Sequence, residues 1–303
     1  DQVQPETAGL LLALTVGARE SLPTEQRASF QQTGTVHLLV ISGLHVGIVV
    51  VLLEGALVLL GLGTRWRSVV MILFLLFFLE LTGGDVAVTR AVVMGVLYFG
   101  GRLLMRRVDF LTLLAVAALI VLLLNPHDLF QAGFHLSFLA VFWLGWVGIS
   151  WFDRRQREPW ADDQPSWWMT LGGSITRWVG RSVAASLLVF VALSPVLMTG
   201  FGIVSPAVIL LNVLALPIVG GILLLALPVV FIGGLDLVWG AEGAVLRLAS
   251  PLLNAADALA SALIDLITSV ASSAAAFVPA PSLGLGAIVA WQLVLIGVVR
   301  RRR

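Results

Sequence analysis

The sequence predicts an all-α membrane protein: a polytopic transmembrane helix bundle of about 7–9 spans, with amphipathic interfacial helices and one broken helix. Two observations predict this class. Apolar residues make up 59% of the 303 residues, charged residues only 12%, and the mean hydropathy is +1.03. A soluble domain carries about 25% charged residues. Apolar runs also recur along the chain, several near the roughly 20 residues that a helix needs to cross a bilayer.

Composition limits the classes of site. The absence of cysteine excludes disulfides and thiolate metal sites. The formal net charge of +1 argues against a broad basic surface for nucleic acid, so any DNA contact must be local. The chain starts at Asp1 without methionine or a basic leader, so we expect a piece of a longer protein without a signal peptide.

The chain divides into a short lead-in and one membrane domain. Residues 1–34 are too polar to span, and we expect an interfacial amphipathic lead-in there. Residues 35–303 form a single transmembrane domain. It contains a polar loop at 152–165 and an amphipathic helical segment at 237–276 that carries Asp257 and Asp265.

The broken helix is expected at Pro206–Ile232. Asn212, Pro217 and Pro228 interrupt this apolar run. Proline within a span is tolerated where neighbouring groups or water satisfy the freed backbone, so the segment is predicted to line a cavity, with Asn212 holding the break.

The first span, Thr33–Leu60, has an unusual content of polar groups. It carries His37, Ser42, Gly43, His45 and Glu54. Ionisable groups in hydrocarbon are costly and normally face a bundle interior or a watery path, so these residues are site candidates. In one continuous helix, His37 and His45 would lie about 80° apart around the axis. The alternative is that Gly43 serves helix packing, with Ser42 and the histidines bonding to backbone.

Arg90 lies about one turn inside a span predicted at 86–104. It is the best cationic site candidate, because an arginine at this depth is otherwise expensive. The alternative is a buried ion pair with Glu54, Glu80 or Asp85. A second polar wall is expected near the start of the span at 129–151. Its members are Gln131, Gly133, His135 and Ser137.

Metal binding is not predicted. Histidines eight positions apart do not converge on one ion, so neither a metal nor another cofactor is expected. Most of the tryptophans fall at predicted span ends, where an interfacial belt explains them. Trp143 and Trp146, inside the fifth span, are the exceptions.

Arginine positions predict the orientation. Arg65 and Arg67, then Arg102, Arg106 and Arg107, and then the arginines of the polar loop all fall on one side if the spans alternate. The excess of positive charge in cytoplasmic turns makes that side the cytoplasm. The start of the chain is then outside.

The run HLLVISGLHVG at 37–47 is followed by Thr89-Arg90-Ala91, by PHDLFQAGFHLSFL at 126–139 and by FGIVSPAVILLNVLALP at 201–217. In this order, the four segments resemble the Competence domain of the ComEC/Rec2 DNA-uptake channels. The resemblance implies a bacterial inner-membrane channel that passes single-stranded DNA into the cytoplasm during natural transformation. In such a channel Arg90 is the best candidate for contact with a phosphate, and Trp143 and Trp146 are candidates for stacking on bases.

The resemblance also implies partners. These are single-stranded DNA, membrane lipid, an extracellular DNA receptor and a cytoplasmic helicase-type motor. A small OB-fold domain would precede this segment, and a metallo-β-lactamase-like domain would follow it. Any nuclease activity would reside in that second domain, so this chain itself is not expected to be an enzyme.

Two other functions stay open. A small-solute or ion-coupled secondary transporter would use the broken helix at 206–232. An intramembrane hydrolase would use Ser42 with a nearby histidine as a dyad, since no HExxH run is present.

Overall fold

The computed structural model describes residues 4–84, 86–106, 109–148, 167–239, 249–273, 278–279 and 281–301. The predicted polar loop at 152–165 and Asp85 lie outside these residues. The helices are α1 (Pro5–Val16), α2 (Thr24–Gln32), α3 (Gly43–Leu59), α4 (Thr64–Leu81), α5 (Val86–Leu103), α6 (Phe110–Leu124), α7 (Ala132–Trp143), α9 (Trp167–Phe201), α10 (Val208–Trp239), α12 (Ser250–Ala271) and α13 (Leu285–Arg301).

Shorter elements join these helices. Three 3-10 turns are η1 (Arg19–Ser21), η2 (Thr35–Leu38) and η3 (Pro126–Phe130), and η4 (Leu144–Gly148) is a π-turn. The strands β1 (Ile203–Val204) and β2 (Val278–Pro279) pair antiparallel. Within the described residues, five helical segments are long and apolar enough to cross a membrane, one of them being η2 and α3 taken together, and four further apolar helices are shorter. The predicted all-α polytopic class is confirmed.

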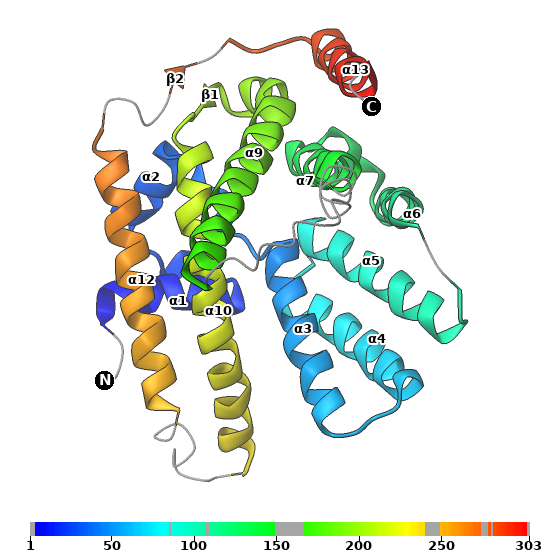
Figure 1. Cartoon of the computed structure of the whole chain (residues 1–303), viewed down its shortest axis with the longest axis vertical. Coiled ribbons are helices and arrows are strands. Elements are labelled where there is room, and N and C mark those ends of the chain that lie inside the picture. The colour runs from blue at the N-terminus through cyan, green and yellow to red at the C-terminus, as the bar shows by residue number, and fades with distance from the viewer. Residues whose placement is uncertain are drawn as a thin grey trace.

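The helices gather in two groups (Figure 1). α1, α2, α10 and α12 pack together, and α3, α4 and α5 pack together beside them. α10 contacts both α3 and α12, so one apolar core of buried side chains runs through the two groups. A second core joins α6 and α7 around Leu114, Val121, Phe134 and Phe138, and α5 side chains pack against it.

The lead-in at 1–34 is built into the first of these groups. Leu10 and Leu14 on α1 are fully buried, and α1 packs against α10 and α12. The contact with η1 is close because Gly9 has no side chain: a Cβ there would overlap the backbone oxygen of Ser21. The lead-in thus belongs to the helical core, and its position at a membrane surface stays a prediction.

The first span is not one helix. η2 ends at Leu38 and α3 begins at Gly43. Ser42 between them has an extended backbone, with φ −111° and ψ 174°, and caps α3. The expectation that His37 and His45 share one continuous helix is therefore wrong. A serine that accepts hydrogen bonds from the next backbone N–H groups favours a helix start over a helix interior.

α10 also differs from expectation, because it is one helix across both Pro217 and Pro228. Each proline removes one backbone hydrogen bond, which a long helix tolerates when neighbours hold it. α12, α9, α3 and α1 all pack against α10. The predicted break in 206–232 is wrong, and the interruption lies at 39–42 instead.

The predicted amphipathic segment at 237–276 contains α12, whereas 240–248 and 274–276 lie outside the described residues. Ala256, Ala260, Leu263 and Ile267 form its buried stripe, which faces the core shared with α10. Asp257 is half-buried and accepts a hydrogen bond from Thr7 on α1. This carboxylate therefore joins α1 of the lead-in to α12.

Candidate functional site

Arg90 on α5 is buried where three helices meet. Its Nη1 donates a hydrogen bond to the backbone oxygen of Ser137 on α7. Its Cζ lies 5.8 Å from the ring centroid of Phe138, a distance at which a guanidinium is attracted to an aromatic face. Arg90 forms no ion pair with any described residue. The alternative of a pair with Glu54 or Glu80 therefore does not hold.

The first residue of α3 lies directly against this guanidinium. A Cβ built on Gly43 would come within 3.0 Å of Arg90 Nη2. Unlike Nη1, Nη2 donates no hydrogen bond to a described residue, and it is not sealed from solvent. The N-terminal end of a helix carries partial positive charge, so Gly43 and Arg90 bring two positive features together. This arrangement is suited to an anion.

Ser42 and His45 form a capping box at the start of α3. The Ser42 N–H donates to His45 Nδ1 at 3.2 Å, and the Leu44 N–H donates to Ser42 Oγ at 3.2 Å. Oγ also lies 3.1 Å from Nδ1, the contact that a hydrolase dyad would need. Here, however, the helix cap accounts for the pairing, and no described residue orients the imidazole through its other nitrogen.

That other nitrogen, His45 Nε2, is buried without a hydrogen-bond partner among the described residues. Because Nδ1 accepts from backbone, a neutral ring carries its proton on Nε2. A buried donor without an acceptor is costly. His45 thus keeps one unused N–H near the start of α3.

Glu54 belongs to a different cluster at the far end of α3. Its Oε1 lies 3.2 Å from Arg67 Nη1 on α4 and 2.9 Å from Arg102 Nη1 on α5. One carboxylate therefore joins three helices at the end where arginines were expected to mark the cytoplasmic side. Glu54 is not part of the group around Arg90.

His37 and Asn212 come together although they are far apart in sequence. His37 Nδ1 donates to the Gly34 backbone oxygen at 3.0 Å, which fixes the ring within its own turn. The side chain of Asn212 on α10 lies beside the ring. Its Oδ1 is buried and accepts no hydrogen bond of standard geometry from a described residue. Asn212 thus faces η2 and does not hold a break in α10.

The predicted wall on the fifth span is only partly assembled. Ser137 joins Arg90, but through its backbone oxygen. His135 packs edge-on to Phe134, with 5.8 Å between ring centroids. No described atom of another segment lies within 4 Å of the place that a Cβ on Gly133 would take. Gln131 donates to Asp128 and so belongs to a different group, whereas a shared surface of Gly133, His135 and Ser137 stays a prediction.

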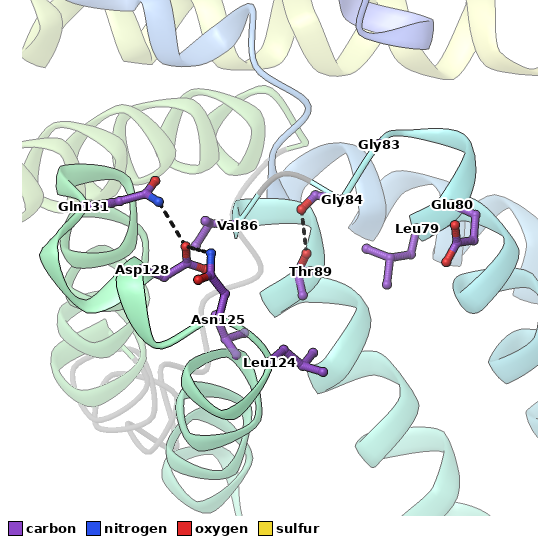
Figure 2. Close-up of a pocket in the computed structure, with 11 residues that line it drawn as sticks. Leu79, Glu80, Gly83, Gly84, Val86, Thr89, Leu124, Asn125, Asp128 and Gln131 are labelled. Atoms are coloured by element: carbon purple, nitrogen blue, oxygen red, sulfur yellow. Dashed lines mark hydrogen bonds between the residues drawn. The ribbon is translucent and has the colours of Figure 1, made fainter.

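Gln131 lies in a pocket of about 530 Å³ that was not predicted from the sequence. Figure 2 shows the pocket between the turn joining α4 to α5 and the turn joining α6 to α7. Its most buried polar residue is Asp128. The sequence contains a signal for this polar cluster. Asn125 is the N-cap of η3, and Asp128 stands three residues later, the position whose side chain often bonds back to the N-cap residue.

Trp143 is fully buried, so its ring faces leave no room for a base. Its Nε1 donates to Gln292 Oε1 at 2.8 Å, and Gln292 Nε2 donates to the Ala192 backbone oxygen at 2.8 Å. This chain of bonds ties α7 to α13 and α9. Trp143 is a packing residue, and Trp146 lies against it with 5.7 Å between ring centroids.

Metal-ligand groups do not assemble in this part of the chain. No group of three or more histidine, aspartate or glutamate side chains converges within the described ranges. The histidines of the first span thus do not meet acidic ligands there.

Comparison with known proteins gives a consistent result. Residues 14–303 match the family described as Competence protein. The chain is 41% identical over 138 residues to "ComE operon protein 3" of Bacillus subtilis (strain 168), a match that covers 46% of this chain and 18% of that protein. It is 32% identical over 128 residues to an uncharacterized protein of Aquifex aeolicus (strain VF5), covering 42% of this chain and 30% of that protein.

The matched segments thus make up less than a third of these relatives. No solved structure matches the chain. The family match covers nearly the whole sequence, and its helices are those of a membrane protein. The chain belongs to the Competence protein family.

Proposed function

We propose that this chain forms the path by which one strand of DNA crosses the bacterial inner membrane into the cytoplasm during natural transformation. Membership of the Competence protein family supports a role in DNA uptake, as does the similarity to ComE operon protein 3. The several long apolar helices support a multi-pass position in the membrane. The observation that carries the proposal is the buried Arg90 beside the start of α3.

The proposed chemistry is a phosphate contact at Arg90 Nη2. Nη1 is occupied by the Ser137 oxygen, and the guanidinium lies over Phe138, so the side chain is held in place. Nη2 lies beside Gly43 at the positive end of α3, without a neutralising carboxylate among the described residues. A single such contact binds a passing phosphate without trapping it, as conduction requires.

We propose no catalytic role for this chain. The partners proposed are single-stranded DNA, membrane lipid, an extracellular DNA receptor and a cytoplasmic helicase-type motor. An OB-fold domain and a metallo-β-lactamase-like domain of the same protein are proposed to flank the segment, the second carrying any nuclease activity. The transporter alternative depended on a broken helix at 206–232, and α10 is continuous there.

The experiment follows labelled DNA in a competent host. The gene is deleted and supplied back as wild type, Arg90→Ala, Arg90→Lys or His45→Ala, and surface-bound and internal DNA are measured separately. We expect deletion, Arg90→Ala and His45→Ala each to leave DNA at the surface without an internal strand. Arg90→Lys keeps the positive charge but loses the planar guanidinium, with its several N–H donors and its contact with the Phe138 ring. We therefore expect this variant to retain partial uptake.

Protein levels in the membrane separate the outcomes. Normal levels with lost uptake support the proposal. If Arg90→Ala and His45→Ala remove the folded protein, their role is structural. If deletion leaves internalisation unchanged, DNA translocation is excluded.

A further inference from the structure

We propose that the pocket beside Asp128 is a nucleobase subsite that accepts bases carrying an exocyclic amino group. This inference rests on the proposed function, because it names the part of the DNA strand that the pocket takes. Its volume of about 530 Å³ is in the range of small-ligand sites, roughly 300–1,000 Å³. The pocket is separate from the Arg90 contact but adjoins it along α5.

The lining combines apolar walls with one polar side. Leu79, Val86, Val121 and Leu124 supply the walls. The polar side chains are Glu80, Thr89, Asn125, Asp128 and Gln131, and no basic side chain among the described residues lines the pocket. Two acidic groups disfavour phosphate, and apolar walls with a hydrogen-bond acceptor favour the flat, uncharged body of a base.

Two hydrogen bonds fix the carboxylate of Asp128 and leave one of its oxygens able to accept a further hydrogen bond. Its Oδ1 takes both amide donors, Asn125 Nδ2 at 2.7 Å and Gln131 Nε2 at 3.1 Å. Only 6% of the residue is exposed. Oδ2 receives no hydrogen bond from a described residue, yet it is not sealed from solvent. Figure 2 shows this network on one side of the pocket, with Glu80 well apart from it.

The pocket lies where an entering strand would meet it. Glu54 joins Arg67 and Arg102 at the arginine-rich end of α3, α4 and α5. The pocket is at the opposite end, at the turn between α4 and α5, which positive-inside orientation places outside. Thr89 lines it and Arg90 is the next residue of α5. Consecutive helical residues point about 100° apart, so the base contact and the phosphate contact are at the same level of α5 but on different faces.

The exocyclic groups of cytosine and thymine predict which of the two bases the pocket prefers. A carboxylate accepts a hydrogen bond from the cytosine N4 amino group, whereas thymine offers a carbonyl at that position. Two oxygens that face each other repel. The pocket is therefore expected to favour cytosine over thymine at equal strand charge.

The test measures binding of fluorescent strands to the full-length protein in lipid nanodiscs. The probes are oligo-dC, oligo-dT and oligo-dC built with N4,N4-dimethylcytosine, each about 20 nucleotides long. We expect oligo-dC to bind at least about threefold more tightly than oligo-dT, and dimethylation to abolish the difference. Asp128→Asn is expected to bring oligo-dC to the affinity of oligo-dT.

A matched pair of variants tests the pocket without touching the network. Leu123 and Leu124 are each 72% exposed, but only Leu124 lines the pocket. Leu124→Trp fills it, and we expect loss of the cytosine preference. Leu123→Trp is expected to keep that preference. This pair decides the question even if Asp128→Asn fails to fold.

Two results overturn the inference. One is equal affinity of the wild type for oligo-dC and oligo-dT, and the other is the same behaviour of both tryptophan variants. In either case, binding that still depends on Arg90 leaves the proposed function standing. If neither strand binds and Arg90→Ala changes nothing, the proposed function itself fails.

Discussion

Gly43 on α3 and Arg90 on α5 approach so closely that a Cβ on Gly43 would lie 3.0 Å from Arg90 Nη2. The missing side chain is what lets the guanidinium reach the start of α3 while Nη1 stays on the Ser137 oxygen. The closeness of two helices and the position of the buried charge therefore depend on the same glycine.

Gly43→Ala is expected to lower DNA uptake several-fold while the protein still inserts, because the added methyl group displaces Nη2 by a few tenths of an ångström or more. Gly47→Ala, four residues along the same helix, is the control, since nothing lies within 4 Å of its Cβ position. Alanine there is expected to leave uptake unchanged and to stabilise α3 by up to about 1 kcal/mol. Internalised label and membrane level are measured for both. Equal uptake by the two variants would show that the Gly43 contact is unimportant.

Glu54→Gln is expected to lower the stability of the folded protein by about 1–3 kcal/mol, because two arginines lose their shared carboxylate in a partly buried position. Thermal unfolding of the detergent-solubilised protein measures this. Glu80→Gln on α4 is the control, since Glu80 is exposed and forms no ion pair with a described residue. A melting temperature equal to that of the control contradicts the role of Glu54 in joining α3, α4 and α5.

Asp257→Ala is expected to loosen α1 from α12 at a cost of about 1 kcal/mol, because Asp257 Oδ1 accepts hydrogen bonds from Thr7 Oγ1 and the Gln4 N–H. Asp265→Ala removes an exposed carboxylate two turns further along α12 and is expected to be neutral. Limited proteolysis within residues 1–34 distinguishes them. Equal cleavage of both variants would argue against the link.

Gly9→Ala is expected to destabilise the protein by about 1–3 kcal/mol, because the new methyl group meets the Ser21 backbone oxygen, which cannot rotate away. Gly55→Ala on α3 has open space around its Cβ position and serves as the control. Denaturant or thermal midpoints of the purified protein give the comparison. An unshifted midpoint for Gly9→Ala would mean that α1 and η1 separate easily.

Local features of the sequence predict much of the fold. Apolar length located the long helices, and glycine, proline and arginine marked their ends. The interruption at 39–42 was missed because Ile41-Ser42-Gly43 is apolar enough to pass for helix. Only the cap geometry of Ser42 distinguishes a start from an interior. Conversely, Pro217 and Pro228 suggested a break that packing around α10 prevents.

The candidate site was harder to foresee. Arg90 stood out because a charge inside an apolar run needs a reason, but its partner turned out to be a backbone oxygen. Every peptide carries such an oxygen, so no residue type reveals it. Its place in the first span groups Glu54 with the histidines, whereas in the structure its Oε1 contacts Arg67 and Arg102 on other helices.

The sequence by itself determined that this is a polytopic helical membrane domain of the Competence family, because hydropathy, helix-ending residues and family motifs are all properties of contiguous stretches. Only the tertiary structure decided which polar groups meet. It brought Gly43 to Arg90, Asn212 to His37, and Glu54 to Arg67 and Arg102. The physical reason is that helix crossings set these contacts, and crossings depend on side-chain packing between segments far apart in the chain.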